Sequence, residues 1–309
     1  MKNIQWATIL RWFVMLLAIG LLIWLLTAEG WGDIYAAFRQ VAIWRLGLVV
    51  LLTLISRLAV AGRWHALLRG ADIKTSYAQT VRITFAGLFA SNFLPTTIGG
   101  DLVRLGGGIR LGYDRAIVLA SLVVDRLVGM TGMALAVPLA LLGIPASALT
   151  QGKMGALPGL LLVGTWREHP WVHRLGAALR HLWEALTRWI RRPMSLLLAL
   201  VFTLIHMLCT FGSVALILGG MNQTASFWLI GGLWSIGYFI TLLPISVNGI
   251  GTQELAITFL YTRFVGISSD SSLALALFMR ALPMLASLPG ALFVPEMIAG
   301  NRKKANHES

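Results

Sequence analysis

Six long apolar segments set the strongest limit on how this chain can fold. They cover approximately residues 6–28, 46–66, 116–142, 148–166, 194–219 and 271–294. Each is close to the length of about 20 apolar residues that a helix needs to cross a bilayer. Only 12% of the 309 residues are charged, about half the share found in water-soluble domains. The sequence therefore predicts an all-α polytopic membrane protein with about six full transmembrane helices.

The first of these segments has to be distinguished from a secretory signal peptide. Its apolar part runs from Phe13 to Ala28, extends back to Trp6 and contains no small-residue cleavage pattern. We therefore expect an uncleaved first span. The chain has one cysteine, Cys209, within an apolar segment, which excludes a disulfide framework and a cysteine metal cluster.

Two further apolar segments, 77–111 and 227–264, are broken by proline and glycine. The first contains "NFLPTTIGGDLVR" and the second "LLPISVNGIGTQE", each with a Leu-Pro pair followed by a polar, glycine-rich turn. Non-helical backbone at membrane depth is tolerated only where it is buried in protein or lines a water-filled cavity. The sequence predicts that each segment is a re-entrant helical hairpin, which enters and leaves the membrane on one side.

Lysine and arginine lie mainly beside one set of segment ends. This set holds Lys2, Arg63, Arg69, Lys74, Arg82, Arg104, Arg110, Arg115, Arg167, Arg174, Arg180, Arg188, Arg191, Arg192, Arg302, Lys303 and Lys304. The opposite set holds only Arg39, Arg45, Lys153 and Arg263. The positive-inside rule predicts cytoplasmic termini in the plasma (inner) membrane, with the two hairpins entering from opposite sides. The net charge of +13 then favours anionic lipid headgroups as partners and not nucleic acid.

Two parts of the chain also resemble one another. The stretch "GYDRAIVLASLVVDRLVGM" (112–130) aligns without a gap with "GISSDSSLALALFMRALPM" (266–284). The predicted membrane domain therefore comprises a first span with an external loop (1–45), repeat 1 (46–142), a connecting span with an amphipathic helix (143–193), repeat 2 (194–294) and a cytoplasmic tail (295–309). The charges give the repeats opposite orientations. Such inverted repeats are typical of transporters whose substrate binds between them.

Arg126 and Arg280 occupy equivalent places in this alignment. Each lies about ten residues into an apolar segment, which is about 15 Å deep at 1.5 Å per residue. An arginine at that depth costs at least about 2.5–3.5 kcal/mol on insertion scales. Two such residues could bind the phosphate oxygens of a substrate, or they could form structural ion pairs. The sequence leaves both interpretations open.

Other charged residues could share this site or neutralise it. The candidates are Asp101, Arg104, Asp125, Glu254 and Arg57. The carboxylates could exchange protons or hold the arginines, and desolvation would disfavour their charged forms. The predicted hairpin tips comprise Pro95, Thr96, Thr97, Gly99, Gly100, Pro244, Ser246, Asn248, Gly249 and Gly251. Their glycines permit tight reversal, and their polar side chains can contact an anion or satisfy open backbone groups.

The segment 166–193 has apolar residues at helical spacing among many arginines, which predicts a basic amphipathic helix on the inner leaflet. Its His169, His173 and His181 have no accompanying carboxylate cluster, so we expect neither a metal nor another cofactor. Enzyme motifs are also lacking. The order Ile98-Gly99-Gly100-Asp101 does not match the Gly-x-Gly-Asp element of intramembrane aspartyl proteases, and the sequence has no Gly-x-Ser-x-Gly, His-Glu-x-x-His or phosphate-loop pattern.

The motifs "LPTTIGGDLVRL", "DRAIVLASLVVDRLVGM" and "LPISVNGIGTQE" resemble the transmembrane region of lysylphosphatidylglycerol synthases, also called the flippase-like family. The resemblance covers nearly the whole chain. It matches Pro95, Gly100, Asp101, Arg104, Asp125, Arg126, Pro244, Gly249, Gly251 and Glu254 to the family's motifs. It implies a lipid flippase-like fold, and shorter members are associated with handling polar lipids. Asp101 stands where a longer Glu is common in relatives, which leaves the substrate open.

The sequence ends at Ser309, without the aminoacyl-transferring domain of the synthases, so we expect no synthesis of lysyl-lipid by this chain. The favoured hypothesis is a flippase-like or scramblase-like transporter of a polar, anionic phospholipid, glycolipid or polyprenyl-phosphate lipid. Two alternatives remain. The chain could be a non-transporting membrane partner that holds a lipid-synthesis enzyme through 166–193, or an intramembrane lipid-modifying enzyme that uses Asp101 or Glu254.

Overall fold

The computed structural model describes residues 39–92, 99–143, 189, 191–242 and 249–294. Four of the described helices are long and apolar enough to cross a membrane. They are α3 (Ile43–Gly70), α6 (Arg115–Ala136), α10 (Pro193–Gly220) and α13 (Ser269–Ser287), which continues into the 3-10 helix η4 (Leu288–Leu292). These helices confirm four of the six predicted spans. The other two, 6–28 and 148–166, lie outside the described residues, as does most of the predicted amphipathic helix.

Shorter helices lie between the long ones. They are α4 (Tyr77–Ser91) and α5 (Gly99–Arg110) after α3, and α11 (Phe227–Leu242) and α12 (Thr252–Leu260) after α10, with the π-helical turn η3 (Tyr261–Val265). The predicted span 116–142 is not one continuous helix. Proline lacks a backbone N–H, and its ring crowds the preceding turn, so it often kinks or breaks a helix. A turn at Val137–Pro138 separates α6 from α7 (Leu139–Gly143).

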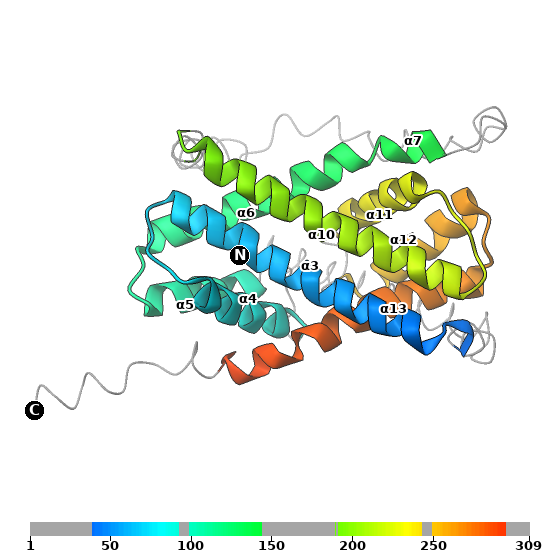
Figure 1. Cartoon of the computed structure of the whole chain (residues 1–309), viewed down its shortest axis with the longest axis horizontal. Coiled ribbons are helices and arrows are strands. Elements are labelled where there is room, and N and C mark those ends of the chain that lie inside the picture. Colours follow the sequence, from blue (N-terminus) through cyan, green and yellow to red (C-terminus); the bar gives the residue numbers. More distant parts are fainter. Residues whose placement is uncertain (1–38, 93–98, 144–188, 190, 243–248, 295–309) are drawn as a thin grey trace, which may run out of the picture.

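The helices α3 and α10 form the longest pair in the described structure. They run antiparallel and side by side (Figure 1). At one end Arg192 Nη2 lies 2.7 Å from the Asp72 carboxylate, and Trp189 donates a hydrogen bond to the carbonyl of Leu67. At the other end Arg45 donates to the carbonyl of Leu216 at 3.4 Å. The pair is therefore tied at both ends.

The two long helices also end in the same way. Each has 28 residues, and its equivalent positions differ by 150 in number. Asp72 and Asn222 follow in the left-handed region, with φ of 63° and 56°, where Asp and Asn are the non-glycine residues most often found. The helix α5 begins 153 residues before α12, and α6 begins 154 residues before α13. The described parts of the two halves thus have the same order of helices.

Small residues allow close helix contacts within and between the halves. A Cβ on Gly87 would lie 2.7 Å from the carbonyl oxygen of Gly100, so α4 and α5 touch through backbone. Between the halves the contacts are reciprocal. A Cβ on Gly232 of α11 would meet the backbone of Ala140 in α7, and one on Gly290 of η4 would meet the carbonyl of Phe85 in α4. Each half therefore packs its last turns against the first short helix of the other.

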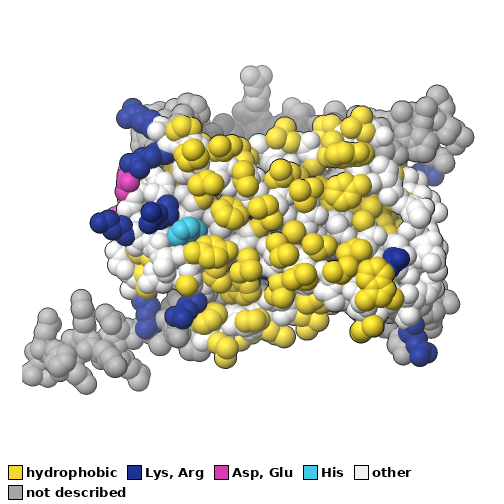
Figure 2. Space-filling view, in the orientation of Figure 1, with side chains coloured by type: hydrophobic (Ala, Val, Ile, Leu, Met, Phe, Trp, Pro, Cys, Tyr) yellow, Lys and Arg dark blue, Asp and Glu magenta, His cyan; other side chains and the backbone are white. Residues whose placement is uncertain are grey.

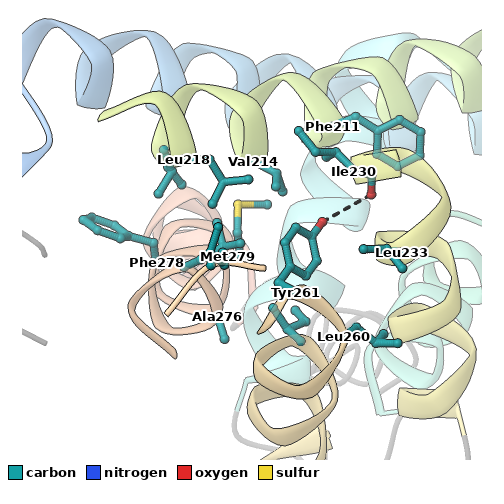
Figure 3. Close-up of a cluster of buried hydrophobic side chains, with 14 of the residues drawn as sticks. Phe211, Val214, Leu218, Ile230, Leu233, Leu260, Tyr261, Ala276, Phe278 and Met279 are labelled. Atoms are coloured by element: carbon teal, nitrogen blue, oxygen red, sulfur yellow. Dashed lines mark hydrogen bonds between the residues drawn. The ribbon is translucent and has the colours of Figure 1, made fainter. Parts of the chain in front are cut away.

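The largest buried cluster joins α10, α11, α12 and α13 (Figure 3). Tyr261 is fully buried at its centre and donates a hydrogen bond to the carbonyl of Ile230 in α11. The opposite surface of the long helices is apolar and exposed. In Figure 2 hydrophobic side chains form a broad band over α3 and α10, with Lys and Arg gathered towards both ends of the molecule. This distribution is the one expected of a protein surrounded by lipid.

Replacing Gly232 by alanine tests the contact between the halves. The added methyl group would overlap the backbone of Ala140, so we expect a loss of about 1–3 kcal/mol in stability, measured by thermal unfolding in detergent. The matched control is Gly47→Ala, where nothing lies within 4 Å of the new Cβ. Since alanine favours a helix over glycine, the control should keep or raise the midpoint. Equal midpoints for both variants would contradict the packing described here.

Candidate functional site

Asp125 is the centre of a buried charge network in the first half. It lies in α6 and is only 1% exposed. Arg63 Nε of α3 lies 2.6 Å from one carboxylate oxygen, and Arg104 Nη2 of α5 lies 3.0 Å from the other. Two guanidinium groups therefore neutralise one carboxylate and join three helices. A buried ion pair is maintained only with this kind of close, hydrogen-bonded geometry.

The network continues from Arg104 towards Arg126. Arg104 Nη1 lies 3.2 Å from one oxygen of Asp101, and the other oxygen accepts a hydrogen bond from Arg126 Nε. The Arg104 guanidinium also stacks over the ring of Trp64, 4.3 Å from its centre, which adds a cation–π attraction. Among the described residues the network joins three arginines and two aspartates.

Arg280 forms the corresponding ion pair in the second half. Its guanidinium pairs with Glu254, and it donates to the carbonyl of Gly249 at 2.8 Å and to Gln253 at 3.3 Å. Glu254 is fully buried and also accepts a hydrogen bond from the N–H of Gly251 at 2.9 Å. Gly249 and Gly251 both have positive φ, 71° and 80°, which other residues seldom adopt. The glycines and the acid together hold the start of α12 against α13.

The two pairs are equivalent in construction. In both halves an arginine of the fourth element, Arg126 or Arg280, donates from Nε to an acid in the first turn of the preceding short helix. The sequence alignment paired these two arginines, and the structure gives each an acidic partner of the predicted set, Asp101 or Glu254.

A cavity of about 300 Å³ lies between the halves. Its lining includes Thr53, Ser56 and Arg57 of α3; His206, Thr210 and Ser213 of α10; Trp234, Gly237, Tyr238 and Thr241 of α11; Gln253 and Ile257 of α12; Met279, Arg280, Pro283 and Met284 near the end of α13; and Asn92 and Met133. The residues of each long helix recur at three- and four-residue spacing, so each helix presents one face to the cavity.

Arg57 is the charged cavity residue with the fewest partners among the described residues. Its Nε is buried without a hydrogen-bond partner, and the described residues provide no acid within salt-bridge distance of it. Nearby, Ser56 and His206 share a hydrogen bond of 2.6 Å across α3 and α10. A guanidinium in this setting is a strong attractor for an anion, because low dielectric strengthens its field.

The predicted site residues therefore fall into two places. Arg57 and Arg280 line the cavity. Glu254 does not line it but forms an ion pair with Arg280. Arg126, Asp101, Arg104 and Asp125 belong to the charge network and are not among the lining residues. Of the predicted tips, Gly99, Gly100, Gly249 and Gly251 are described, whereas Pro95, Thr96, Thr97, Pro244, Ser246 and Asn248 lie outside the described residues.

Sequence reasoning assigned Arg63 to the positive charges that follow a span, but the structure places it within α3, 9% exposed and bonded to Asp125. The correction follows from helix length, because α3 extends beyond residue 66 to Gly70. Sequence reasoning also missed His206, Tyr238 and Gln253, which line the cavity. The spacing of Trp234, Tyr238 and Thr241 on one helix face was the available signal.

The model of the family described as "Lysylphosphatidylglycerol synthase TM region" matches residues 11–290. The chain belongs to this family. It is therefore an integral membrane protein related to lipid metabolism or transport, and the family region that it matches is not the catalytic aminoacyl-transferring domain of the synthases. Comparisons with curated proteins and with solved structures gave no match.

Substitution Asp125→Asn tests whether the charge network stabilises the fold. The change would leave Arg63 and Arg104 buried beside a neutral amide, which should cost about 3–5 kcal/mol and lower the thermal midpoint in detergent. The control is Asp72→Asn, which removes the exposed pair with Arg192 and should have little effect. A midpoint for Asp125→Asn as high as that of the control would show that Asp125 does not hold the network together.

Proposed function

We propose that this family member moves a polar, anionic lipid between the two leaflets of the membrane. The observation that carries the proposal is the cavity with Arg57 and Arg280. Burying a guanidinium without a counter-charge is costly in a membrane protein, and a lipid phosphate would supply the missing negative charge. The headgroup would occupy the cavity while the acyl chains stay in the surrounding lipid.

The volume supports a headgroup and not a whole lipid as the occupant. A cavity of about 300 Å³ lies at the lower end of the range for small-molecule sites, about 300–1,000 Å³. Phosphate oxygens are well matched by guanidinium groups, which can donate two parallel hydrogen bonds. Arg280 is held in place by Glu254 and Gly249, so its guanidinium is oriented before a ligand arrives.

The proposed transport mechanism depends on an inverted repeat. This repeat is supported by the equal lengths of α3 and α10, by their antiparallel pairing and by the matching turns at Asp72 and Asn222. The paired helices α4–α5 start and finish on the side where α3 ends, and α11–α12 start and finish on the opposite side (Figure 1). We infer two opposed re-entrant hairpins, with six full spans in the complete chain.

The two halves differ at the positions that form the site. The offsets of 150, 153 and 154 pair Arg63, Arg104 and Asp125 with Ser213, Ile257 and Met279, respectively. All three of the latter line the cavity, whereas the former are joined by ion pairs. The proposed site in the second half is therefore open at the place where its counterpart in the first half is closed.

This asymmetry suggests how the lipid would pass through the membrane. Breaking the Arg63–Asp125–Arg104 ion pairs would open the first half, and closing the cavity would make the second half the closed one. Arg126 would then take the role that Arg280 has in the described state. The greater number of basic residues beside Gly70, Arg110 and Arg192 supports the proposal that this end, and the chain termini, face the cytoplasm under the positive-inside rule.

The alternative functions have less support. A lipid-modifying enzyme based on Asp101 or Glu254 would need these carboxylates to reach a substrate, but both accept hydrogen bonds from arginine and neither lines the cavity. A role as a passive partner for a lipid-synthesis enzyme would not require an arginine-lined cavity. The same reconstitution experiment separates the three functions.

The test uses purified protein in vesicles that contain an acyl-labelled anionic lipid, with quenching of the outer leaflet as the readout. We expect accelerated exchange with the native chain. Arg57→Gln and Arg280→Gln should each slow it about tenfold or more, as charge-assisted hydrogen bonds are lost. Arg263→Gln, which changes an exposed arginine outside the cavity, serves as the matched control.

Exchange at the rate of protein-free vesicles for every anionic lipid tested would exclude the transporter proposal. Equal slowing by Arg263→Gln would mean that general surface charge, and not the cavity, determines the rate. Chemical conversion of the labelled lipid by the protein alone would favour the enzyme.

A further inference from the structure

We propose that His206 binds a proton together with the anion, so that a proton gradient drives the lipid across the membrane. The inference rests on the proposed lipid-transport function and names its coupling ion. It follows from the position of His206 between the two halves, from its hydrogen-bond partner and from the charges around the cavity.

The hydrogen bond between Ser56 and His206 joins two equivalent positions. The residues differ by 150 in number, the offset that relates α3 to α10, and Ser56 Oγ lies 2.6 Å from His206 Nδ1. A contact between a residue and its own equivalent is expected where a twofold axis passes. This contact therefore supports an axis that relates the two halves and runs close to His206.

Neighbouring contacts of α3 and α10 are reciprocal, as such an axis requires. A Cβ on Gly62 would meet the ring of Phe202, and a Cβ on Gly212 would lie 3.4 Å from Leu52. Gly62 and Leu52 are the equivalents of Gly212 and Phe202 at the same offset of 150. The two contacts are therefore the same contact made once by each half.

A residue at the axis keeps its place when the first half opens and the cavity closes. In that opposite state each lining position would be taken by its equivalent, so that Met207 would replace Arg57. Ser56 and His206 both line the cavity and would replace each other, and among the described lining residues this pair alone does so. His206 would therefore be open to either side of the membrane in turn, as a group that carries a proton across must be.

The chemistry of the pair suits a proton that is bound and released. Imidazole is the side chain that gains or loses a proton near neutral pH. Its partner Ser56 has a hydroxyl group, which can donate to the neutral ring or accept from the protonated one. No described residue bonds to Nε2 of His206. The ring can therefore take up a proton without losing the contact between α3 and α10.

Charged and titratable groups surround His206 from the neighbouring helices. They are Arg57 and Arg63 of α3, Asp125 of α6, Tyr238 of α11 and Arg280 of α13. The acids Asp125 and Glu254 already hold Arg63 and Arg280, respectively. A proton on His206 would add a second cation beside Arg57, and a phosphate bound in the cavity would offset that cost. Anion and proton would then strengthen each other's binding by the same factor.

The transported unit is one proton with one phosphodiester anion. His206 takes a proton from the water on the side where the cavity is open, as the lipid phosphate binds Arg57 and Arg280. On the opposite side the phosphate leaves, and the imidazolium returns its proton to the water there. The pair adds no net charge to the protein, so a pH gradient and not the membrane potential should drive the lipid.

The test imposes a pH gradient of about one unit on vesicles that contain the full-length protein and labelled phosphatidylglycerol, whose phosphodiester keeps a single negative charge near neutral pH. Potassium and valinomycin hold the membrane potential at zero. One proton per lipid should give about a tenfold ratio of label between the leaflets for each pH unit, with the excess on the alkaline side. Protein-free vesicles give the background.

His206→Gln tests the residue itself, because an amide can keep the hydrogen bond to Ser56 but takes up no proton near neutral pH. This variant should leave the label divided as in protein-free vesicles. The matched control is His65→Gln, which changes a half-buried histidine of α3 that bonds to Thr80 and does not line the cavity. The control should keep the tenfold ratio.

Calorimetry checks the same residue without transport. Short-chain phosphatidylglycerol is titrated into the full-length protein in detergent, in buffers of different ionisation enthalpy. Binding should take up protons with the native chain and none with His206→Gln. Binding by the native chain without proton uptake would contradict the inference.

Each contrary outcome of the vesicle assay has a separate meaning. Exchange by the native protein with an even division of label under the gradient would overturn proton coupling and leave lipid transport standing, as would a ratio that follows an imposed membrane potential instead. A tenfold ratio retained by His206→Gln, or lost equally in His65→Gln, would overturn the role of His206. Exchange of no anionic lipid at any pH would overturn the proposed function and the inference with it.

Discussion

The pairing of buried arginine with carboxylate is the interaction on which the rest of the described structure depends. Asp125 joins α3, α5 and α6 through Arg63 and Arg104, and Glu254 joins α12 to α13 through Arg280. In a low-dielectric interior each such charge has to be matched by another. The helices can therefore take only those relative positions in which the charged atoms meet, and this constraint also fixes the walls of the cavity.

Arg57 is the exception to this pairing, and the proposed function depends on it. The other buried arginines of the network have acidic partners within the chain, whereas Arg57 faces the cavity without a described acid beside it. A protein that pairs its other buried arginines with acids, and leaves Arg57 facing a cavity between the halves, has a place for an anion from outside. The membrane itself is the most concentrated source of such anions.

Much of this arrangement could be predicted from the sequence, and the rest required three-dimensional contacts. Segment length and hydropathy predicted the four described spans, and the alignment of Arg126 with Arg280 predicted that these residues are equivalent. The membership in the family was also predicted and is confirmed. However, the sequence could not divide the charged residues between network and cavity. Arg63 was counted as a cytoplasmic charge because a hydropathy profile does not show that α3 continues past residue 66. His206 and Tyr238 were missed because their importance depends on which helix faces converge, and that is set by contacts between residues distant in sequence.

The central claim is that a lipid phosphate supplies the counter-charge for Arg57. The most direct measurement is an experimental structure of the protein in nanodiscs rich in phosphatidylglycerol, with attention to density between α3 and α13. The account predicts a phosphate within hydrogen-bonding distance of both Arg57 and Arg280. A carboxylate of the chain itself bonded to Arg57, or a cavity filled only by acyl chains, would contradict it.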